Sequence, residues 1–350
     1  MRTKRMLQWC VWPVLLLASA VLVVPRAHAT ACTTQSQMTS AQRDGLANAA
    51  RTMLNQVKSG DVQALQANTI PAVAVDFSGI RNSMDYLKPL VQSATVTVDV
   101  LYILDASSDP VGTPRTDFFC GSPVVVLNFT NLPPATYALA ITHATGVQQP
   151  QQIALILQKS AGDRWMLAGF FDKPMIEGGH DGLWYWSSAR KYAQSKADWG
   201  AWLYYRIASN LLNPLDFLSS PNLQKLQQEA DKVHPSSFPG EHPLALNASG
   251  VAFNVTAIDT TTTFGPLDLD VHYTPDPTQA AQLRDPPSAR KQVTEIMAAL
   301  LQMHPELQSA FHGIWVHADQ GNATLFALEL PMNQIAASPQ PSGVNSSVAR

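Results

Sequence analysis

The sequence predicts an α+β protein with two mixed domains and a helical segment between them. The spacing of apolar residues along the chain predicts this class. Apolar residues recur with a helical period over residues 40–91, alternate with polar residues over 95–171, and return to a helical period over 174–235. A second set of alternating runs, interrupted by one helix, occupies 249–336. Helices followed by successive strands are typical of α+β folds, in which the helices pack on one face of an antiparallel sheet.

The first 29 residues have the pattern of a secretory signal peptide. Basic residues open the segment, residues 10–24 are apolar, and Ala27-His28-Ala29 matches the small-residue cleavage pattern. The apolar stretch is shorter than the roughly 20 residues that span a bilayer. We therefore expect cleavage before Thr30 and a secreted or periplasmic location in a bacterial cell envelope.

The mature chain is acidic. The full chain has 23 Lys and Arg residues against 26 Asp and Glu. Loss of the signal removes four basic residues and no acidic ones, so the net charge falls from −3 to −7. An acidic chain without a run of Lys or Arg offers no binding surface for a phosphate backbone. We expect no nucleic acid as partner.

Two cysteines, Cys32 and Cys120, remain in the mature chain, and the sequence leaves two outcomes open. In an exported protein two cysteines most simply form a disulfide. Alternatively, Ala31 supplies the small residue that a lipoprotein signal needs before its cysteine, and a lipidated Cys32 would tether the protein to the membrane. The outcomes exclude one another, because lipidation of Cys32 leaves Cys120 as a free thiol.

The first domain is predicted to span residues 30–175. A helix opens after the cap residues Thr39-Ser40 and stops at Gly60, because Ser and Thr favour helix starts and Gly favours helix ends. Val96, Val98, Val100, Tyr102 and Leu104 are expected to share one face of the first strand. Two further helices and five strands are expected at 62–67, 80–91, 95–104, 124–130, 136–143, 153–159 and 164–171.

This order of elements resembles the NTF2-like (cystatin-like) α+β superfamily. Residues 58–80, KSGDVQALQANTIPAVAVDFSGI, look like that superfamily's passage from the first helix to a short second helix and a short strand. The resemblance implies a helix-covered cone whose interior some members use for catalysis and others for binding or dimerisation. Candidate acid or base residues are Asp76, Asp99, His143 and Asp172. We expect turn or solvated roles for them, and no convergence.

Residues 176–234 are predicted to be helical and resemble a single tetratricopeptide (TPR) hairpin. A frame of about 34 residues fits from Gly182, although Ser188 and Pro214 depart from the pattern. A third helix from Pro221 would cap the hairpin. The matching positions are Tyr185, Ala189 and Tyr192 on the first helix and Ala201, Tyr205 and Ala208 on the second.

Eight aromatic residues crowd into residues 182–208. A two-layer hairpin buries three of them but lacks the volume for the rest, since each ring buries about 150–250 Å². We expect the remaining rings to be covered by both flanking domains, with the hairpin as a bracket. A groove for a carbohydrate, peptide or protein ligand and a homodimer interface are the alternatives. The five rings concerned are Trp184, Trp186, Trp199, Trp202 and Tyr204.

A Pro-rich linker at residues 235–248 is expected to lead into a C-terminal α+β domain at 249–336, followed by a disordered tail at 337–350. The domain is predicted to have the order ββαββ. Its strands are expected at 251–258, 267–273, 313–318 and 323–330, with one helix between Ser288 and Pro305.

Polar residues on two of these strands form the strongest chemical candidate. Asp268, Asp270 and His272 fall at alternate positions of one strand and therefore point to one side. His317 and Asp319 share a side on another strand of the same sheet. Imidazoles together with carboxylates suit Zn²⁺ or a similar divalent ion. The alternative is an ordinary solvated face, because an antiparallel sheet commonly exposes one side to water.

The sequence lacks the motifs of the common enzyme classes. No HExxH, paired CxxC, GxSxG or phosphate-cradling Gly-rich loop is present, and we expect no cofactor. Our hypothesis is a non-catalytic binding or scaffolding module of the cell envelope. One alternative is a metal-dependent hydrolase that uses the Asp/His face of the C-terminal sheet. Another is a purely structural lipoprotein anchored through Cys32.

Overall fold

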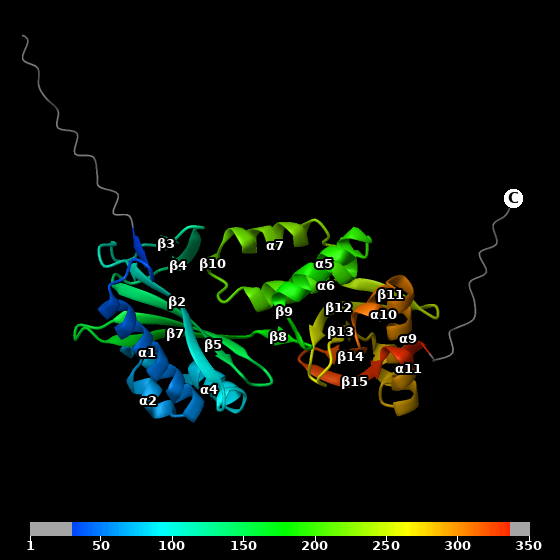
Figure 1. Cartoon of the computed structure of the whole chain (residues 1–350). Coiled ribbons are helices and arrows are strands. Elements are labelled where there is room, and N and C mark those ends of the chain that lie inside the picture. Colours follow the sequence, from blue (N-terminus) through cyan, green and yellow to red (C-terminus); the bar gives the residue numbers. More distant parts are fainter. Residues whose placement is uncertain (1–29, 337–350) are drawn as a thin grey trace, which may run out of the picture.

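The computed structural model describes residues 30–336 and is mixed α+β. Figure 1 shows the sheet-containing domains side by side, with the helices of residues 182–231 lying above and between them. The predicted signal peptide (1–29) and tail (337–350) lie outside the described residues. Within residues 30–336, no helix combines the length and apolar character that a bilayer crossing requires.

The first domain packs its helices on one face of a five-stranded antiparallel sheet, in the order β1-β2-β5-β6-β7. The predicted helices and strands are present, and α3, β1 and β3 are additional. The elements are α1 (Ser40–Ser59), α2 (Val62–Ala67), α3 (Pro71–Ala74), α4 (Ser78–Val91), β1 (Ala31–Thr34), β2 (Thr95–Asp105), β3 (Arg115–Cys120), β4 (Val125–Thr130), β5 (Thr136–Thr145), β6 (Gln151–Lys159) and β7 (Trp165–Pro174).

The ends of α1 follow the predicted cap residues. The Thr39 side chain accepts from the Gln42 backbone N–H, and the Gln42 side chain accepts from the Thr39 N–H, which forms a capping box. At the other end Gly60 adopts a left-handed conformation with φ 71°. The apolar stripe between these caps, including Leu46 and Met53, is buried against the sheet. The sheet side chains that face the helices are also apolar, so apolar side chains fill the space between the helices and the sheet.

A β-bulge in β2 makes one sequence prediction wrong. The pairing of β2 with β5 shifts between Val98 and Val100, so that Asp99 is the extra residue. Val96 and Val98 therefore pack toward the helices, whereas Val100, Tyr102 and Leu104 pack on the opposite face. The five residues do not share one face, because a one-residue insertion reverses the alternation of all residues after it.

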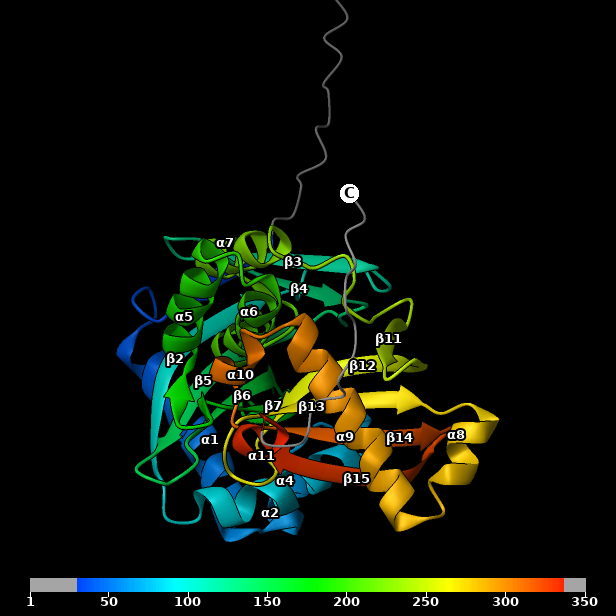
Figure 2. The same ribbon diagram turned by 90° about the vertical axis from the view of Figure 1, so that its right-hand side faces the viewer.

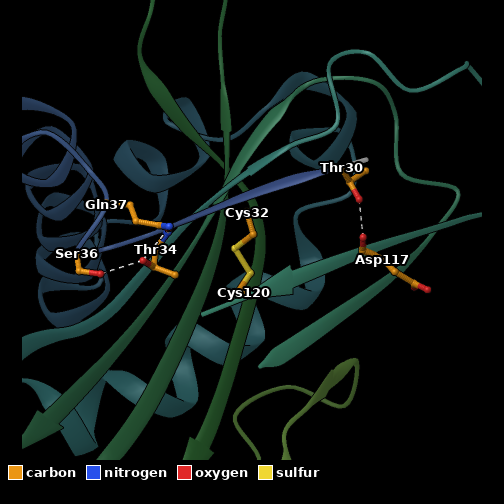
Figure 3. Close-up of a disulfide and its surroundings, with 7 residues drawn as sticks. All are labelled: Thr30, Cys32, Thr34, Ser36, Gln37, Asp117 and Cys120. Atoms are coloured by element: carbon orange, nitrogen blue, oxygen red, sulfur yellow. Dashed lines mark hydrogen bonds between the residues drawn. A yellow bond between two sulfur atoms is a disulfide. The ribbon is translucent and has the colours of Figure 1, made fainter. Parts of the chain in front are cut away.

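A small sheet in the order β10-β4-β3 covers that opposite face. Phe118 and Leu127 are fully buried there against the main sheet. Cys32 on β1 and Cys120 on β3 form a disulfide with their Cα atoms 5.3 Å apart, which links the main sheet to the small one (Figure 3). The disulfide occupies the Cys32 sulfur that the lipidation alternative requires.

We predict that replacing both cysteines with serine lowers the free energy of unfolding by about 3–4.5 kcal/mol, because the bond closes a loop with a sequence separation of 88 residues. Urea denaturation with and without a reducing agent measures the effect. Reductant should destabilise the wild-type protein and leave the double variant unchanged. Equal unfolding midpoints for the oxidised wild type and the double variant would contradict the prediction.

The central segment contains one short strand pair, a single short strand that joins the small sheet of the first domain, and three helices. The helices agree with the predicted hairpin and capping helix in position. The elements are β8 (Ile176–Glu177), β9 (His180–Asp181), α5 (Gly182–Gln194), α6 (Asp198–Leu212), β10 (Leu218–Ser219) and α7 (Pro221–Asp231).

The C-terminal domain is a five-stranded sheet in the order β11-β12-β13-β14-β15, with α9 across one face (Figure 2). The strand β11 lies within the segment predicted to be a linker and pairs with β12. The strands β13 and β14 are parallel, and the other neighbours are antiparallel. The elements are β11 (Leu244–Ala248), β12 (Val251–Thr261), β13 (Asp268–Thr274), α8 (Pro277–Gln282), α9 (Pro286–Met303), α10 (Leu307–Ala310), β14 (Gly313–Gln320), β15 (Ala323–Pro331) and α11 (Met332–Ala336).

The helical hairpin shares one core with the C-terminal domain and is not a symmetrical bracket. The Tyr204 hydroxyl donates to the Ala310 carbonyl at 2.6 Å, and the Trp199 ring stacks on His304 with centroids 3.9 Å apart. The helix α6 also contacts β7 of the first domain, and the residues after α6, among them Leu215 and Leu218, join the core of that domain. The expected cover of these rings by both flanking domains is therefore found on the C-terminal side, whereas apolar residues after α6 reach the core of the first domain.

Glu177 lies in the connection between the domains, where its backbone carbonyl accepts a 2.8 Å hydrogen bond from the Tyr185 hydroxyl. Burial, followed by the nearby Asp259 carboxylate, raises the pKa of the Glu177 carboxyl from 4.5 to about 7. The folded protein thus holds this proton more tightly than the unfolded chain. The contribution of Glu177 to stability declines as the pH rises from 4.5 to 7.

We predict that Glu177→Gln stabilises the protein at pH 8 by about 2 kcal/mol relative to wild type, with little effect at pH 4, because the amide carries no charge to bury. Urea denaturation at the two pH values measures the difference. Glu241→Gln, at an exposed position, is the matched control and should be neutral at both. Equal effects of Glu177→Gln at pH 4 and pH 8 would refute the prediction.

Candidate functional site

The polar face of the C-terminal sheet lies opposite α9. Leu269, Val271 and Tyr273 of β13 are fully buried in the core that contains α9, so the alternate residues of β13 face away from it. Parallel pairing sets His272 beside His317. The structure brings together four of the five predicted metal-ligand residues. Asp268 is on the same face but belongs to a second group, with His312 and Glu329.

The first group consists of Asp270, His272 and His317, whose ligand atoms all lie within 4.8 Å of one another. Asp270 Oδ1 is 3.4 Å from His272 Nε2 and 3.1 Å from His317 Nε2. The two imidazole rings stack with centroids 4.6 Å apart and planes 12° apart. Asp270 Oδ1 and His317 Nε2 are buried and have no hydrogen-bond partner. The three ligand atoms are thus close together, and two of them lack a hydrogen bond of acceptable geometry.

Asp319 holds His272 from the other side of its ring. Asp319 Oδ2 is 2.6 Å from His272 Nδ1, and the Thr324 hydroxyl donates to Asp319 Oδ1 at 2.6 Å. A carboxylate at Nδ1 favours the tautomer whose proton is on that nitrogen, which leaves the Nε2 lone pair free. Metal-binding histidines commonly have such a partner, because it fixes the ring orientation.

The two histidines differ in charge in the metal-free protein. The Asp270 carboxylate and then Asp319 raise the pKa of His272 to about 9. Burial lowers the pKa of His317, and the charge of His272 lowers it further. Burial alone would raise the pKa of Asp319, but its hydrogen bonds from Thr324 and His272 prevail and lower it. In the metal-free protein at neutral pH, His272 is therefore a cation between two carboxylates, beside a neutral His317, and binding of a metal ion at Nε2 would release the proton from that nitrogen.

Aromatic residues border the group on one side. The Trp315 ring centroid is 4.2 Å from that of His317, and Phe264 packs on Trp315 at 4.9 Å. The His272 side chain keeps 33% of its surface exposed and that of His317 keeps 12%. The group is thus partly shielded from water and still accessible to a small ligand.

The candidate residues of the first domain behave differently. Asp76 accepts from the Ser78 hydroxyl at 2.7 Å, in agreement with its predicted turn role. The β2 bulge brings Asp99 against His143 in an ion pair, and His143 also contacts Gln152 at 3.0 Å. The expectation of no convergence is wrong for this pair. The pair lies on the sheet face opposite the helices, as the register with the core residue Ile141 indicates.

The five aromatic candidates do not form a common surface. Trp199 and Tyr204 are buried, and Trp186 Nε1 donates to Glu229 at 2.7 Å. Trp202 lines a cleft of about 290 Å³ between α6 and α7. Trp184 is 40% exposed and stacks on His180 with centroids 3.6 Å apart. Most of these rings are therefore packing residues, and only Trp184 presents much of its surface to solvent.

We predict that iodide quenches a small part of the tryptophan fluorescence and that Trp184→Phe removes most of that part, because iodide reaches only exposed rings. Trp199→Phe is the matched control, since Trp199 is buried in a neighbouring helix; this variant should leave the quenchable part unchanged. A large quenchable part that persists in Trp184→Phe would show that the other rings face solvent.

Comparisons with known proteins give no relative of this chain. No protein-family model matches it, and neither a curated protein nor a solved structure matches it.

Proposed function

We propose that this protein is an exported binding module whose ligand is a divalent transition-metal ion, held by Asp270, His272 and His317. One observation carries the proposal. Three ligand atoms converge, and two of them are buried without a hydrogen-bond partner. A buried polar atom without a partner costs about 1–3 kcal/mol, and a bound cation would remove that cost at both atoms.

The ligand set favours Zn²⁺. Two imidazole nitrogens and one carboxylate oxygen are typical zinc ligands, and three protein ligands leave a fourth position for water or a further ligand. Asp319 would act as the outer partner that orients His272. The site uses side chains from two adjacent strands of a sheet and not from a loop, which supports a fixed geometry for the ion.

We further propose the NTF2-like arrangement for the first domain and the TPR-like arrangement for α5 and α6. The helices on one face of an antiparallel sheet support the first. The buried small residues Ala189, Ala201 and Ala208 at the contact of α5 and α6 support the second. Apolar side chains fill the space beneath the helices of the first domain, which favours a scaffolding role for it. Export to the cell envelope is part of the same proposal.

We predict that the purified mature protein binds Zn²⁺ and that the double variant Asp270→Ala/His317→Ala loses one equivalent, because two of the three ligands are gone. Asp319→Asn should weaken binding by about 10–100-fold, as expected for an outer partner. Calorimetric titration and elemental analysis measure both effects. His180→Ala, which removes an exposed histidine outside the group, is the control. Identical zinc content in wild type and double variant would refute the proposal.

A metal-dependent hydrolase is the second candidate, favoured by the open fourth position of a three-ligand set. An ion with a bound water molecule can supply a nucleophile at neutral pH. Hydrolysis of ester, phosphoester or peptide substrates by the zinc-loaded protein, lost in the same double variant, would favour this candidate. Zinc binding without any such activity would favour the non-catalytic module.

A further inference from the structure

We propose a second cation site on the same sheet face, formed by Asp268, His312 and Glu329 and suited to a hard divalent ion of the Mn²⁺ type. The inference goes beyond the zinc site and does not depend on it. The ligand atoms of these three residues lie within 4.8 Å of one another, and Asp268 Oδ1 is 3.0 Å from His312 Nδ1.

The strongest evidence is a buried carboxylate with an unpartnered oxygen. The Asp268 side chain has no exposed surface, and its Oδ2 atom has no hydrogen-bond partner. Glu329 Oε1 is likewise buried without a partner. Within residues 30–336, neither carboxylate forms a salt bridge with Lys or Arg. Among the described residues, Asp268 has His312 as its only ion-pair partner. Since a buried carboxylate with so little compensation is strongly unfavourable, the arrangement calls for a further cation or a proton.

Gly313 makes room for the two carboxylates to approach each other. A Cβ atom at this position would lie 2.6 Å from Glu329 Oε1 and 3.0 Å from Asp268 Oδ1. The Leu330 carbonyl oxygen would lie 2.8 Å from the same point. Oxygen atoms from three residues thus surround a space that any side chain other than glycine would fill. His312, adjacent in sequence, adds a nitrogen ligand at its edge.

The two groups are separate sites and not one two-metal centre. Asp268 and Asp270 are two positions apart on β13, a separation of about 7 Å along a strand. Ions in two-metal centres lie about 3.5–4 Å apart. The ligand chemistry differs as well, because the second group offers mainly oxygen. Oxygen-rich sets suit Mn²⁺, Mg²⁺ and Ca²⁺, and an added imidazole favours Mn²⁺ among these.

The test uses the mature protein and Mn²⁺ itself, followed by electron paramagnetic resonance. The first site is removed with His272→Ala/His317→Ala, and this variant should still bind one equivalent of Mn²⁺. Adding Glu329→Gln should weaken that binding by at least about tenfold, the lower bound even for outer-partner changes. Adding Glu306→Gln is the matched control, because Glu306 also lies beside a histidine, at 3.6 Å, but belongs to no three-residue group.

Two outcomes would overturn the inference. One is unchanged Mn²⁺ binding after Glu329→Gln, in protein whose circular dichroism shows the native fold. The other is an absence of Mn²⁺ binding together with a more stable Glu329→Gln variant, which would mean that the two carboxyl groups share a proton. Failure of the wild-type protein to bind Zn²⁺ would refute the first site and leave this one standing. Glu329→Gln preserves side-chain size, so a folding defect is not expected to obscure the result.

Discussion

The parallel pairing of β13 and β14 is the constraint on which the polar face depends. The apolar stripe of α9, including Val293, Ile296 and Leu300, is buried on one face of the sheet. A helix of this length between two neighbouring strands brings the chain back to the edge of the sheet where the first strand began, so the second strand runs parallel to the first. Parallel register then places His272 directly beside His317. The burial of α9 thus determines which polar residues meet on the opposite face.

The helical hairpin contributes to the same face indirectly. The Tyr204 hydroxyl binds the last carbonyl of α10, and Phe311 packs against the Tyr204 ring with centroids 5.8 Å apart. The next residue, His312, is then held by its backbone N–H, which donates to the Leu267 carbonyl at 2.8 Å. Packing of aromatic rings between α6 and α10 therefore positions the imidazole that faces Asp268. The aromatic residues of segment 182–208 therefore have mainly a structural role, and they affect the candidate site by positioning His312.

Local patterns predicted most of the helices and the polar row on β13, because caps, helical stripes and alternation depend on neighbouring residues alone. The predicted row Asp268, Asp270 and His272 lies on one face for this reason. His312 and Glu329 were not predicted, since one follows a short helix outside any strand and the other faces Asp268 only through the register of three strands. The sequence signal for Glu329 is a single acidic residue in an otherwise uncharged last strand.

Two further differences arose from tertiary structure. The strand β11 lies in a Pro-rich segment, and only its pairing with β12 makes it a strand. The bulge at Asp99 leaves no signal in the alternation of valines, yet it reverses the faces of β2 and creates the Asp99–His143 pair. Backbone irregularities of this kind are set by how two strands fit together, so a single strand's sequence does not encode them.

Charge balance on the polar face connects the two proposed sites. Asp268, Asp270, Asp319 and Glu329 bring four carboxyl groups to one side of the sheet, and within the described residues none forms a salt bridge with Lys or Arg. The raised pKa of His272 provides one compensating charge, between Asp270 and Asp319. Burial, and then Asp268, raise the pKa of Glu329, so this group resists ionisation. A partly buried face with this excess of acid is neutralised either by protons or by cations. The two imidazoles beside Asp270 favour Zn²⁺ or a similar ion, whereas the oxygen-rich space above Gly313 favours a harder ion such as Mn²⁺. One sheet face would thus bind two classes of cation, distinguished by ligand chemistry.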